Sequence, residues 1–409
     1  MGVVSVFSPA TAGSVGHGFV YGMRLCALLG KRYKLTLFTI NDKTKIEKLE
    51  EAGIKVIASS RFKSGAIDKR RFNKFLILSR FIYGVYRVYY NYKLIDEFFK
   101  TNKDSQIFHF FEFEYIALCF YLLKNKPLLS KTVLGIHIAD FKWIKGRAFS
   151  VNLYKTLIRQ PMAKLCKHAA HITTHGNIIR SIIIKDLGVS PSHVTALNYG
   201  CDVHEIGLSK TDARVHLGIN VKNRIVALFF GVLRSDKGLL EVLRNFNRIS
   251  SEVMLLIVGG EGDIKYKTVT QAIKKFGLDD RVLTVFKYIE EEEVKYYFYA
   301  SDFVLIPHKG DHIAFSGPLS LAVEYCRPVI ASNIGEIGAF VNKNMVGFLF
   351  DHDNWDSFVH VVNNNINNIH AFKSQQFHCI QRNNSWRNMA DQISLIYNKT
   401  IDRCCDLAT

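Results

Sequence analysis

The sequence has few of the residues that mark linkers, disulfide frameworks or metal clusters. Its 409 residues include only seven prolines, so long low-complexity linkers are not expected. Eight cysteines are scattered along the chain without a CxxC pair, and most lie inside apolar stretches. This spacing favours buried thiols in a reducing compartment over a disulfide framework or a structural zinc site.

Long hydrophobic runs are also missing. The nearest candidates, residues 75–90 and 108–123, are interrupted by charged residues and fall short of the ~18 apolar residues that a membrane helix needs. The opening residues, "MGVVSVFSPATAG", lack the basic and apolar regions of a signal peptide. We therefore predict a cytoplasmic protein that is peripheral on the cytoplasmic face of a membrane.

Acidic residues are fewer than basic residues in this sequence. Lysine and arginine together number 54 against 36 acidic residues, which gives a net charge of +18. An anionic membrane, a nucleic acid or a phosphorylated substrate would each fit such a balance, and so would a plain solvated surface. The hydrophobic share of 48% with 22% charged residues indicates a globular, core-forming chain.

Short β-branched runs alternate with longer helical patterns along most of the chain. Strands that are apolar throughout are typical of parallel sheets covered by helices on both faces. Two such series predict an α/β protein with two Rossmann-like domains whose sheets face each other across a cleft. The strands that we expect are 3–7, 35–40, 55–57, 107–110, 133–136, 171–174 and 194–197, then 225–230, 254–258, 282–286, 303–306, 329–331 and 347–350.

A turn-rich junction, "ALNYGCD", separates the two series. It predicts a first domain over 1–203 and a second over 204–380. Residues 381–409 follow as a terminal helix, and we expect this helix to pack back on the first domain. A cleft between two such domains is where a ligand would sit.

The stretch "LFFGVLRSDKGLLEVL" places Gly231, Arg234 and Lys237 between a strand and a helix. Parallel strands deliver their carboxyl ends to the ligand crevice, so both cations would project into it. A guanidinium and an ammonium together suit a diphosphate and would stabilise it as a leaving group. The alternative is an ordinary solvated loop.

Further along, Ser316, Gly317 and Pro318 stand at the start of an apolar helical pattern. The first amides of a helix have no intrahelical partner, and the positive end of its dipole binds phosphate without a charged side chain. Glycine permits close approach of the backbone, and proline suits the first turn. By itself this is a capped helix; together with Arg234 and Lys237 it predicts a diphosphate site.

Several motifs now occur in one order. "FFGVLRSDKGLLEVLRNF", "YIEEEEVKYYFYASDFVLIPH", "RPVIASNIGEIGAFVNKNMVGFLF", "NYGCD" and "SWRNMADQISLIY" resemble segments of family-4 GT-B glycosyltransferases (glycosyl transferases group 1). The resemblance implies that a sugar moves from a nucleotide-diphosphate donor to a glycan or lipid-linked acceptor, in polysaccharide or glycoconjugate synthesis. It implies a hexosyl transferase with the nucleotide-sugar as co-substrate. We expect no metal or other cofactor, because the cationic side chains and the helix start would do the work of a divalent ion, and no Asp-x-Asp pair occurs where a metal-dependent transferase would need one.

The sequence departs from that family at two positions. The family has a glutamate, seven residues and a second glutamate around this loop, contacting the donor sugar and the ribose. Aligned on "RPVIA", these positions hold Ile313 and Leu321, while Glu324 lies three residues later. The usual basis for predicting a retaining reaction is therefore missing, and the stereochemical outcome stays open.

In the first half, the resemblance implies donor contacts from Gly16 and His17 in the glycine-rich loop "SPATAGSVGHG". It also implies that His137, which with Asp140 follows a predicted strand, is the catalytic residue near the donor sugar. The alternatives are a tight turn that needs glycine anyway and a histidine that is simply hydrogen-bonded at a strand end.

Two more carboxylates, Glu112 and Glu114, stand at an expected strand end in "HFFEFEY". Either could be an acceptor-side base. Strand alternation would leave both on the same, solvent-facing side of the sheet.

The segment 61–100 holds ten lysines and arginines interleaved with tyrosine and phenylalanine. Such a segment could lie on an anionic membrane surface, or it could be an ordinary amphipathic helix on its sheet. Nothing in it resembles a nucleic-acid recognition module, so we expect no nucleic-acid partner.

Two alternatives to a glycosyltransferase share the fold. One is a nucleotide-sugar 2-epimerase, which would act on the donor alone. The other is a catalytically silent GT-B subunit that binds a membrane or a partner transferase. The missing carboxylates favour the silent subunit, and the Arg234–Lys237 loop argues against it.

Overall fold

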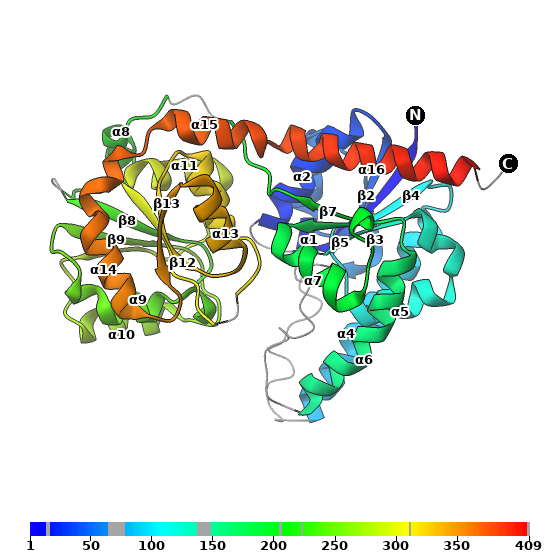
Figure 1. Cartoon of the computed structure of the whole chain (residues 1–409), viewed down its shortest axis with the longest axis horizontal. Coiled ribbons are helices and arrows are strands. Elements are labelled where there is room, and N and C mark those ends of the chain that lie inside the picture. Colours follow the sequence, from blue (N-terminus) through cyan, green and yellow to red (C-terminus); the bar gives the residue numbers. More distant parts are fainter. Residues whose placement is uncertain are drawn as a thin grey trace. The chain divides into compact units, whose positions relative to one another are not determined.

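The computed structural model describes residues 1–13, 17–63, 78–136, 149–203, 207–221, 224–310 and 312–406 (Figure 1). Contacts between these residues divide the chain into two compact units. Unit 1 comprises Met1–Asn198 and Trp386–Thr409, and unit 2 comprises Tyr199–Ser385. The last helix, α16 (Trp386–Asp406), thus belongs to the same unit as the first half of the chain.

Unit 1 contains a sheet of seven parallel strands in the order β3-β2-β1-β4-β5-β6-β7. Its strands are β1 (Val3–Phe7), β2 (Lys34–Asn41), β3 (Val56–Lys63), β4 (Ile107–Phe110), β5 (Thr132–Ile136), β6 (His171–His175) and β7 (Val194–Leu197). The order reverses between β1 and β4, because β2 and β3 extend the sheet to one side of β1 and the later strands extend it to the other.

Besides α16, the helices of unit 1 are α1 (Pro9–Gly13), α2 (His17–Gly30), α3 (Lys43–Glu51), α4 (Leu78–Thr101), α5 (Tyr115–Lys124), α6 (Phe149–His168) and α7 (Asn177–Leu187). Helix α16 packs on α2 and buries Trp386, Met389, Ile393 and Tyr397 on one face. The Tyr397 hydroxyl lies 2.7 Å from His109 Nδ1 on β4.

Unit 2 contains a sheet of six parallel strands in the order β10-β9-β8-β11-β12-β13. Its strands are β8 (Ile225–Phe230), β9 (Val253–Val258), β10 (Val282–Val285), β11 (Phe303–Ile306), β12 (Val329–Asn333) and β13 (Gly347–Asp351). The order reverses between β8 and β11, so both sheets have the arrangement that the apolar strands predicted, and the α/β fold class is confirmed.

The helices of unit 2 cover both faces of its sheet (Figure 1). Along β8, Val226 and Leu228 belong to one buried cluster, while Ala227 and Phe229 belong to another. Alternate residues of a strand point to opposite faces, so a strand that is apolar throughout must be covered twice. The helices are α8 (Lys210–His216), α9 (Leu239–Asn245), α10 (Tyr266–Lys275), α11 (Glu291–Ala300), α12 (Gly317–Glu324), α13 (Gly335–Asn344), α14 (Trp355–Asn365) and α15 (Ser374–Asn383).

The expected strands all form, and the largest difference is at β3. The sequence predicted a strand over 55–57, whereas β3 continues to Lys63, with an irregular register opposite Thr39 and Asn41. This strand is the edge of its sheet, where polar residues such as Ser60 and Arg61 can face water. A prediction based on apolar residues alone therefore ended the strand too early.

Among the described residues, none of the helices combines the length and the apolar character that crossing a bilayer requires.

Candidate functional site

The candidate site of unit 2 begins where β8 ends. Gly231 has a φ of 101°, a conformation that favours glycine. A Cβ atom at Gly231 would lie only 2.7 Å from Lys237 Nζ. The Lys237 ammonium donates to the carbonyl of Phe230 at 3.3 Å, so the lysine folds back over the strand end in space that the glycine leaves free.

Lys237 is held in a partly desolvated position. Burial, and then the charge of Arg234, lower its pKa from 10.5 to about 8. An ammonium with few compensating charges gains more from an anion than a solvated one does. The loop therefore presents a cation that an incoming phosphate group would stabilise.

Arg234 makes a two-pronged contact with Asp236. Its Nε and a terminal nitrogen donate to the two carboxylate oxygens at 3.0 and 2.8 Å. Although burial alone would raise the pKa of Asp236, the hydrogen bonds and charge of Arg234 lower it. Asp263 accepts from the amide and hydroxyl of Ser235 at 2.9 and 2.6 Å, which fixes the turn that carries both cations.

The start of α12 lies beside this loop. A Cβ atom at Gly231 would also come within 3.9 Å of Pro318 Cγ, so three of the expected donor-binding residues, Gly231, Lys237 and Pro318, come together. Pro318 is in the first turn of α12, as expected for a residue without an amide hydrogen. The helix start thus faces the loop that carries Lys237.

Ser316 is the N-cap residue of α12, with Gly317 as the first helical residue. Its side chain is 3% exposed and makes no cap hydrogen bond. Among the described residues, its hydroxyl has no hydrogen-bond partner. A buried hydroxyl without a partner is costly, and a phosphate oxygen would satisfy it together with the first amides of the helix.

Two histidines that the sequence reasoning did not single out lie at the same place. His308 follows β11 and is 4% exposed, and its ring stacks on His312 with centroids 4.1 Å apart. Burial first, then His312 and Lys237, lower the pKa of His308 well below its usual value. The only hint in the sequence was a histidine directly after the apolar strand in "FVLIPH".

Asp236, His308 and His312 also offer metal-ligand atoms within 4.8 Å of one another. The Nδ1 atom of His312 lies 3.8 Å from an Asp236 oxygen. However, Arg234 already binds both oxygens of that carboxylate, and Lys237 adds positive charge close to His308. These surroundings disfavour a divalent cation and favour an anion.

Ile313 and Leu321 occupy the two positions where the family has glutamates. The carbonyl of Ile313 accepts from the amide of Glu336 at 2.8 Å, at the start of α13. Leu321 packs against the unit's core. Glu324 accepts from the amide of Asp202 at 3.1 Å, so it helps to hold the segment that enters unit 2.

Several expected residues of unit 1 cannot be placed. Gly16 and His137, with Asp140, lie outside the described residues, and His17 is described only as the first residue of α2. The carboxyl end of β4 is described, and it corrects the expectation for "HFFEFEY". Glu114 is the N-cap of α5 and accepts from the amide of Ala117 at 2.8 Å, whereas Glu112 accepts from residues that follow β1.

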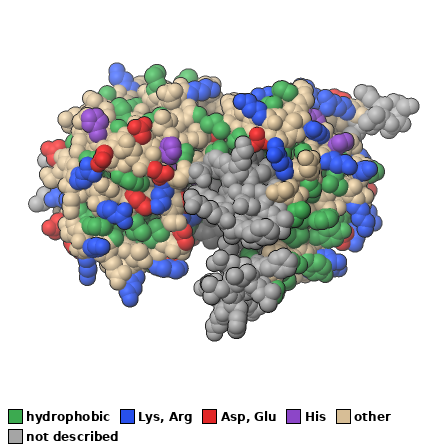
Figure 2. Space-filling view, turned by 60° about the horizontal axis from the view of Figure 1, so that its bottom comes forward, with side chains coloured by type: hydrophobic (Ala, Val, Ile, Leu, Met, Phe, Trp, Pro, Cys, Tyr) green, Lys and Arg blue, Asp and Glu red, His purple; other side chains and the backbone are tan. Residues whose placement is uncertain are grey.

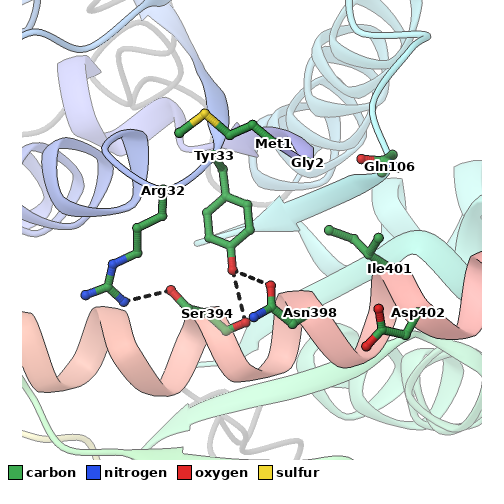
Figure 3. Close-up of a pocket in the computed structure, with 9 residues that line it drawn as sticks. All are labelled: Met1, Gly2, Arg32, Tyr33, Gln106, Ser394, Asn398, Ile401 and Asp402. Carbon is green, nitrogen blue, oxygen red and sulfur yellow. Dashed lines mark hydrogen bonds between the residues drawn. The ribbon is translucent and has the colours of Figure 1, made fainter.

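Unit 1 also has an open pocket of about 670 Å³ at the amino ends of β1, β2 and β4 (Figure 3). Its polar groups are engaged: the Tyr33 hydroxyl contacts Asn398 Oδ1 at 2.8 Å, and Arg32 donates to Ser394 at 3.0 Å. Ligand crevices of parallel sheets lie at the carboxyl ends of the strands. This pocket is therefore at the wrong edge for the chemistry considered above.

The comparisons with known proteins agree with this geometry. Residues 224–368 match the family "Glycosyl transferases group 1". That range contains the loop after β8, the two histidines and α12, so the matched segment coincides with the candidate site. The comparison with curated proteins gave no match.

Solved structures resemble the whole chain. HepE from Anabaena, in complex with UDP and glucose, is 15% identical with a TM-score of 0.73, over 98% of this chain and 100% of that one. Sucrose-phosphate synthase from Thermosynechococcus elongatus has 14% identity and a TM-score of 0.73, over 98% and 100%. WaaG, a glycosyltransferase involved in lipopolysaccharide biosynthesis, has 12% identity and a TM-score of 0.61, over 100% and 99%.

Identities this low establish the fold and leave the substrates open. The structural matches extend over both units. The family match lies within unit 2, which contains the loop with Arg234 and Lys237, here called the cationic loop. Both results confirm the resemblance that the motifs indicated. The chain has the GT-B fold, and its residues 224–368 match the group 1 glycosyl transferases.

Proposed function

We propose that the chain moves a sugar, of hexose type, from a nucleotide-diphosphate donor to a glycan or lipid-linked acceptor in polysaccharide or glycoconjugate synthesis. Unit 2 would bind the donor, and unit 1 would bind the acceptor. The observation that carries the proposal is the position of Lys237, half-buried beside Gly231 and the start of α12. HepE, which has this fold, binds UDP and UDP-glucose.

The cationic loop suits the charge that develops during transfer. When the bond between the sugar and the diphosphate breaks, negative charge grows on the leaving phosphate. Lys237, Arg234 and the first amides of α12 would stabilise it from fixed positions. These groups would do the work for which other transferases use a metal ion. His137 stays our candidate for the residue at the reacting sugar.

A nucleotide screen tests the donor site. The purified protein is heated with UDP, GDP, CMP and ADP and with their common sugar conjugates. A ligand at ~100 times its dissociation constant raises the free energy of unfolding by ~2.7 kcal/mol. We expect one nucleotide to stabilise the protein. If none does, the silent-subunit alternative replaces the proposal, and turnover of a nucleotide-sugar without any acceptor would favour the epimerase.

We further propose that unit 1 binds an anionic membrane through the segment 61–100. Four apolar side chains of α4 are exposed at the spacing of one helix face, namely Ile82, Val85, Tyr86 and Tyr89. Hydrophobic and basic side chains gather on unit 1 in Figure 2 (right). Aromatic side chains beside cations suit the boundary between headgroups and acyl chains.

Sedimentation with vesicles tests this contact. We expect the protein to bind vesicles that contain phosphatidylglycerol, and the variant Val85→Ser/Tyr89→Ser to bind them several-fold more weakly. The control is Val215→Ser, because Val215 is also exposed to solvent but lies on α8 of unit 2. Equal binding by all three proteins would exclude α4 as the membrane contact.

A further inference from the structure

The ends of β8 and β11 lie side by side where the sheet of unit 2 reverses its strand order. The two strands pair with Ala227 opposite Phe303 and Leu228 opposite Val304. Connections leave neighbouring strands in opposite directions at such a reversal, and parallel sheets bind ligands at the crevice that this opens. The residues that follow β11 therefore share one edge of the sheet with the cationic loop.

His308, which follows β11, lies opposite Lys237 of the cationic loop. A Cβ atom at Gly238, the residue after Lys237, would lie only 2.2 Å from the Pro307 carbonyl oxygen. The amide of Lys309 donates to the carbonyl of the residue before Lys237 at 3.0 Å. The residues on either side of His308 thus contact the residues on either side of Lys237, which brings the two loops together along this stretch.

The ring of His308 is buried and held in place. It is 4% exposed, and it stacks on His312 with centroids 4.1 Å apart. The hydroxyl of Ser332 donates to the His308 carbonyl at 2.5 Å, which fixes the backbone. Among the described residues, the Nδ1 atom of His308 is buried without a hydrogen-bond partner. Such an atom is costly to bury, and a bound ligand is one way to satisfy it.

Two more groups at this edge have unused hydrogen-bond capacity. The Lys237 ammonium has three N–H donors, and among the described residues it has one acceptor, the Phe230 carbonyl at 3.3 Å. Ser316 is 3% exposed, and its hydroxyl has no partner in the described part of the chain. The start of α12 is close, because a Cβ atom at Gly231 would lie 2.7 Å from Lys237 Nζ and 3.9 Å from Pro318 Cγ.

The charges at this edge favour an anionic ligand. Lys237 and Arg234 are positive, and Arg234 already engages both oxygens of Asp236. Burial first, then His312 and Lys237, hold the pKa of His308 well below its usual value. A neutral imidazole with its proton on Nδ1 can donate to an anionic oxygen without adding a third positive charge beside the other two.

We propose that His308 is a further donor-binding residue, whose neutral ring donates a hydrogen bond from Nδ1 to an oxygen of the distal phosphate. The inference rests on the proposed function, because it needs a nucleotide-diphosphate donor. Lys237 and the Ser316 hydroxyl hold other oxygens of the same phosphate. Binding draws the Lys237 ammonium from the Phe230 carbonyl toward the phosphate, and this movement gives the phosphate access to the ring.

The proposed contact makes the site specific for a diphosphate. A nucleoside monophosphate has no group at the place of the distal phosphate, so the His308 ring adds nothing to its affinity. All the groups that hold the distal phosphate belong to unit 2. The comparison of a diphosphate with the matching monophosphate therefore isolates the contribution of this ring.

Three substitutions assign the hydrogen bond to one atom of the ring. Asparagine places an N–H donor where His308 has Nδ1, glutamine places it near Nε2, and leucine provides none. Calorimetric titration of the whole chain with UDP and UMP, or with the same pair of the base that the nucleotide screen selects, measures the affinities. For the diphosphate we expect His308→Leu and His308→Gln to bind ~10- to 100-fold more weakly. His308→Asn should stay within about threefold of the wild type, and all variants should bind the monophosphate as the wild type does.

His378→Leu is the matched control. The Nε2 atom of His378 is also buried without a hydrogen-bond partner among the described residues, but His378 lies on α15. This helix contacts the carboxyl end of α12, where Gln381 donates to the Val323 carbonyl at 2.9 Å. We expect its affinity for both nucleotides to be unchanged. Urea unfolding of each variant checks that it is folded under the conditions of the titration.

Three results would overturn the inference. A diphosphate affinity of His308→Leu within about twofold of the wild type would show that the ring makes no useful contact. An equal loss for the diphosphate and the monophosphate would mean that the substitution disturbs the whole site. A loss in His308→Asn as large as that in His308→Leu would exclude Nδ1 as the donor. If the wild type binds no nucleotide, the proposed function fails first, and the inference fails with it.

Discussion

The two sheets of this protein reverse their strand order at equivalent places but carry opposite charges there. In unit 2 the reversal lies between β8 and β11, and Lys237, Arg234 and His308 follow these strands. In unit 1 it lies between β1 and β4, and Ser8 and Glu112 follow. The strand ends of unit 2 therefore present cations, and those of unit 1 present a carboxylate. The fold provides the positions, and a few side chains decide the chemistry.

Each crevice achieves its property by partial desolvation. Burial lowers the pKa of Lys237 to about 8 and raises the pKa of Glu112 to about 7. Low polarity disfavours the charged form of either group, so the same cause moves an acid and a base in opposite directions toward neutral pH. Perturbed groups of this kind cluster at functional sites.

The largest effect should come from removing the cation of unit 2. Lys237→Met keeps the packing of the side chain but removes the charge that a diphosphate would meet. We expect the affinity for the stabilising nucleotide to fall by ~100-fold, or about 2.8 kcal/mol. Calorimetric titration measures it, with Lys274→Met on the exposed surface of α10 as the control. An unchanged affinity would place the anion site elsewhere.

The next effect concerns the stability of unit 1. The folded pKa of Glu112 lies above its unfolded value of 4.5, so the folded state binds more protons, and its stability should fall as the pH rises from 4.5 to about 7. The loss should be on the order of 3 kcal/mol and absent in Glu112→Gln. Urea unfolding of both proteins at several pH values measures it.

Glu97 should change the stability of unit 1 with pH in the opposite direction to Glu112. Although burial alone would raise its pKa, hydrogen bonds from Ser59 and Ser60 lower it. Its contribution should therefore be present above the unfolded pKa and be lost as the pH falls through the folded value. If Glu97→Gln and Glu112→Gln changed the pH dependence of stability in the same direction, the two carboxylates would not be distinguished by their surroundings.

A smaller effect should appear in the pH dependence of nucleotide binding. Lys237 loses its proton above about pH 8, and only the protonated amine attracts phosphate. The affinity should fall by about fivefold between pH 8 and pH 9, about 1 kcal/mol. The fall should be missing in Lys237→Met. A flat profile in the wild type would show that Lys237 does not contact the bound nucleotide.

The smallest effect should follow from the contact between Arg234 and Asp236. The Asp236 carboxylate competes with phosphate for the Arg234 guanidinium, and its negative charge repels the phosphate. The variant Asp236→Asn should therefore bind the nucleotide about threefold more tightly, roughly 0.7 kcal/mol. Weaker binding would mean that Asp236 orients Arg234 for the ligand. Either result refines the view of this crevice as an anion site.

Much of the donor-side geometry could be predicted from local patterns. Gly231, Lys237 and Pro318 were expected to converge, and in the structure they do. The reason is that apolar runs fix the strands, parallel strands share a carboxyl edge, and the residues just after them must lie along that edge. His308 was overlooked because a single histidine after a strand carries no pattern.

The carboxylates could not be separated in the same way. Glu112 and Glu114 are two residues apart, and alternation predicted a shared, exposed position. Their partners come from distant segments: Ala10 lies 102 residues before Glu112, and Arg87 lies 27 residues before Glu114. Which partner a loop side chain meets depends on the neighbouring strand and helix, and strand periodicity carries no information about that.

By itself, the sequence determined that there are two parallel sheets, which runs form their strands, and that cations follow β8. These features are local, because burial on both faces of a strand requires apolar residues at every position. Only the tertiary structure decided which partners Glu112 meets, that Glu324 holds Asp202, and that His308 is buried beside Lys237. Burial and hydrogen-bond partners set these properties, and both arise when segments far apart in the sequence pack together.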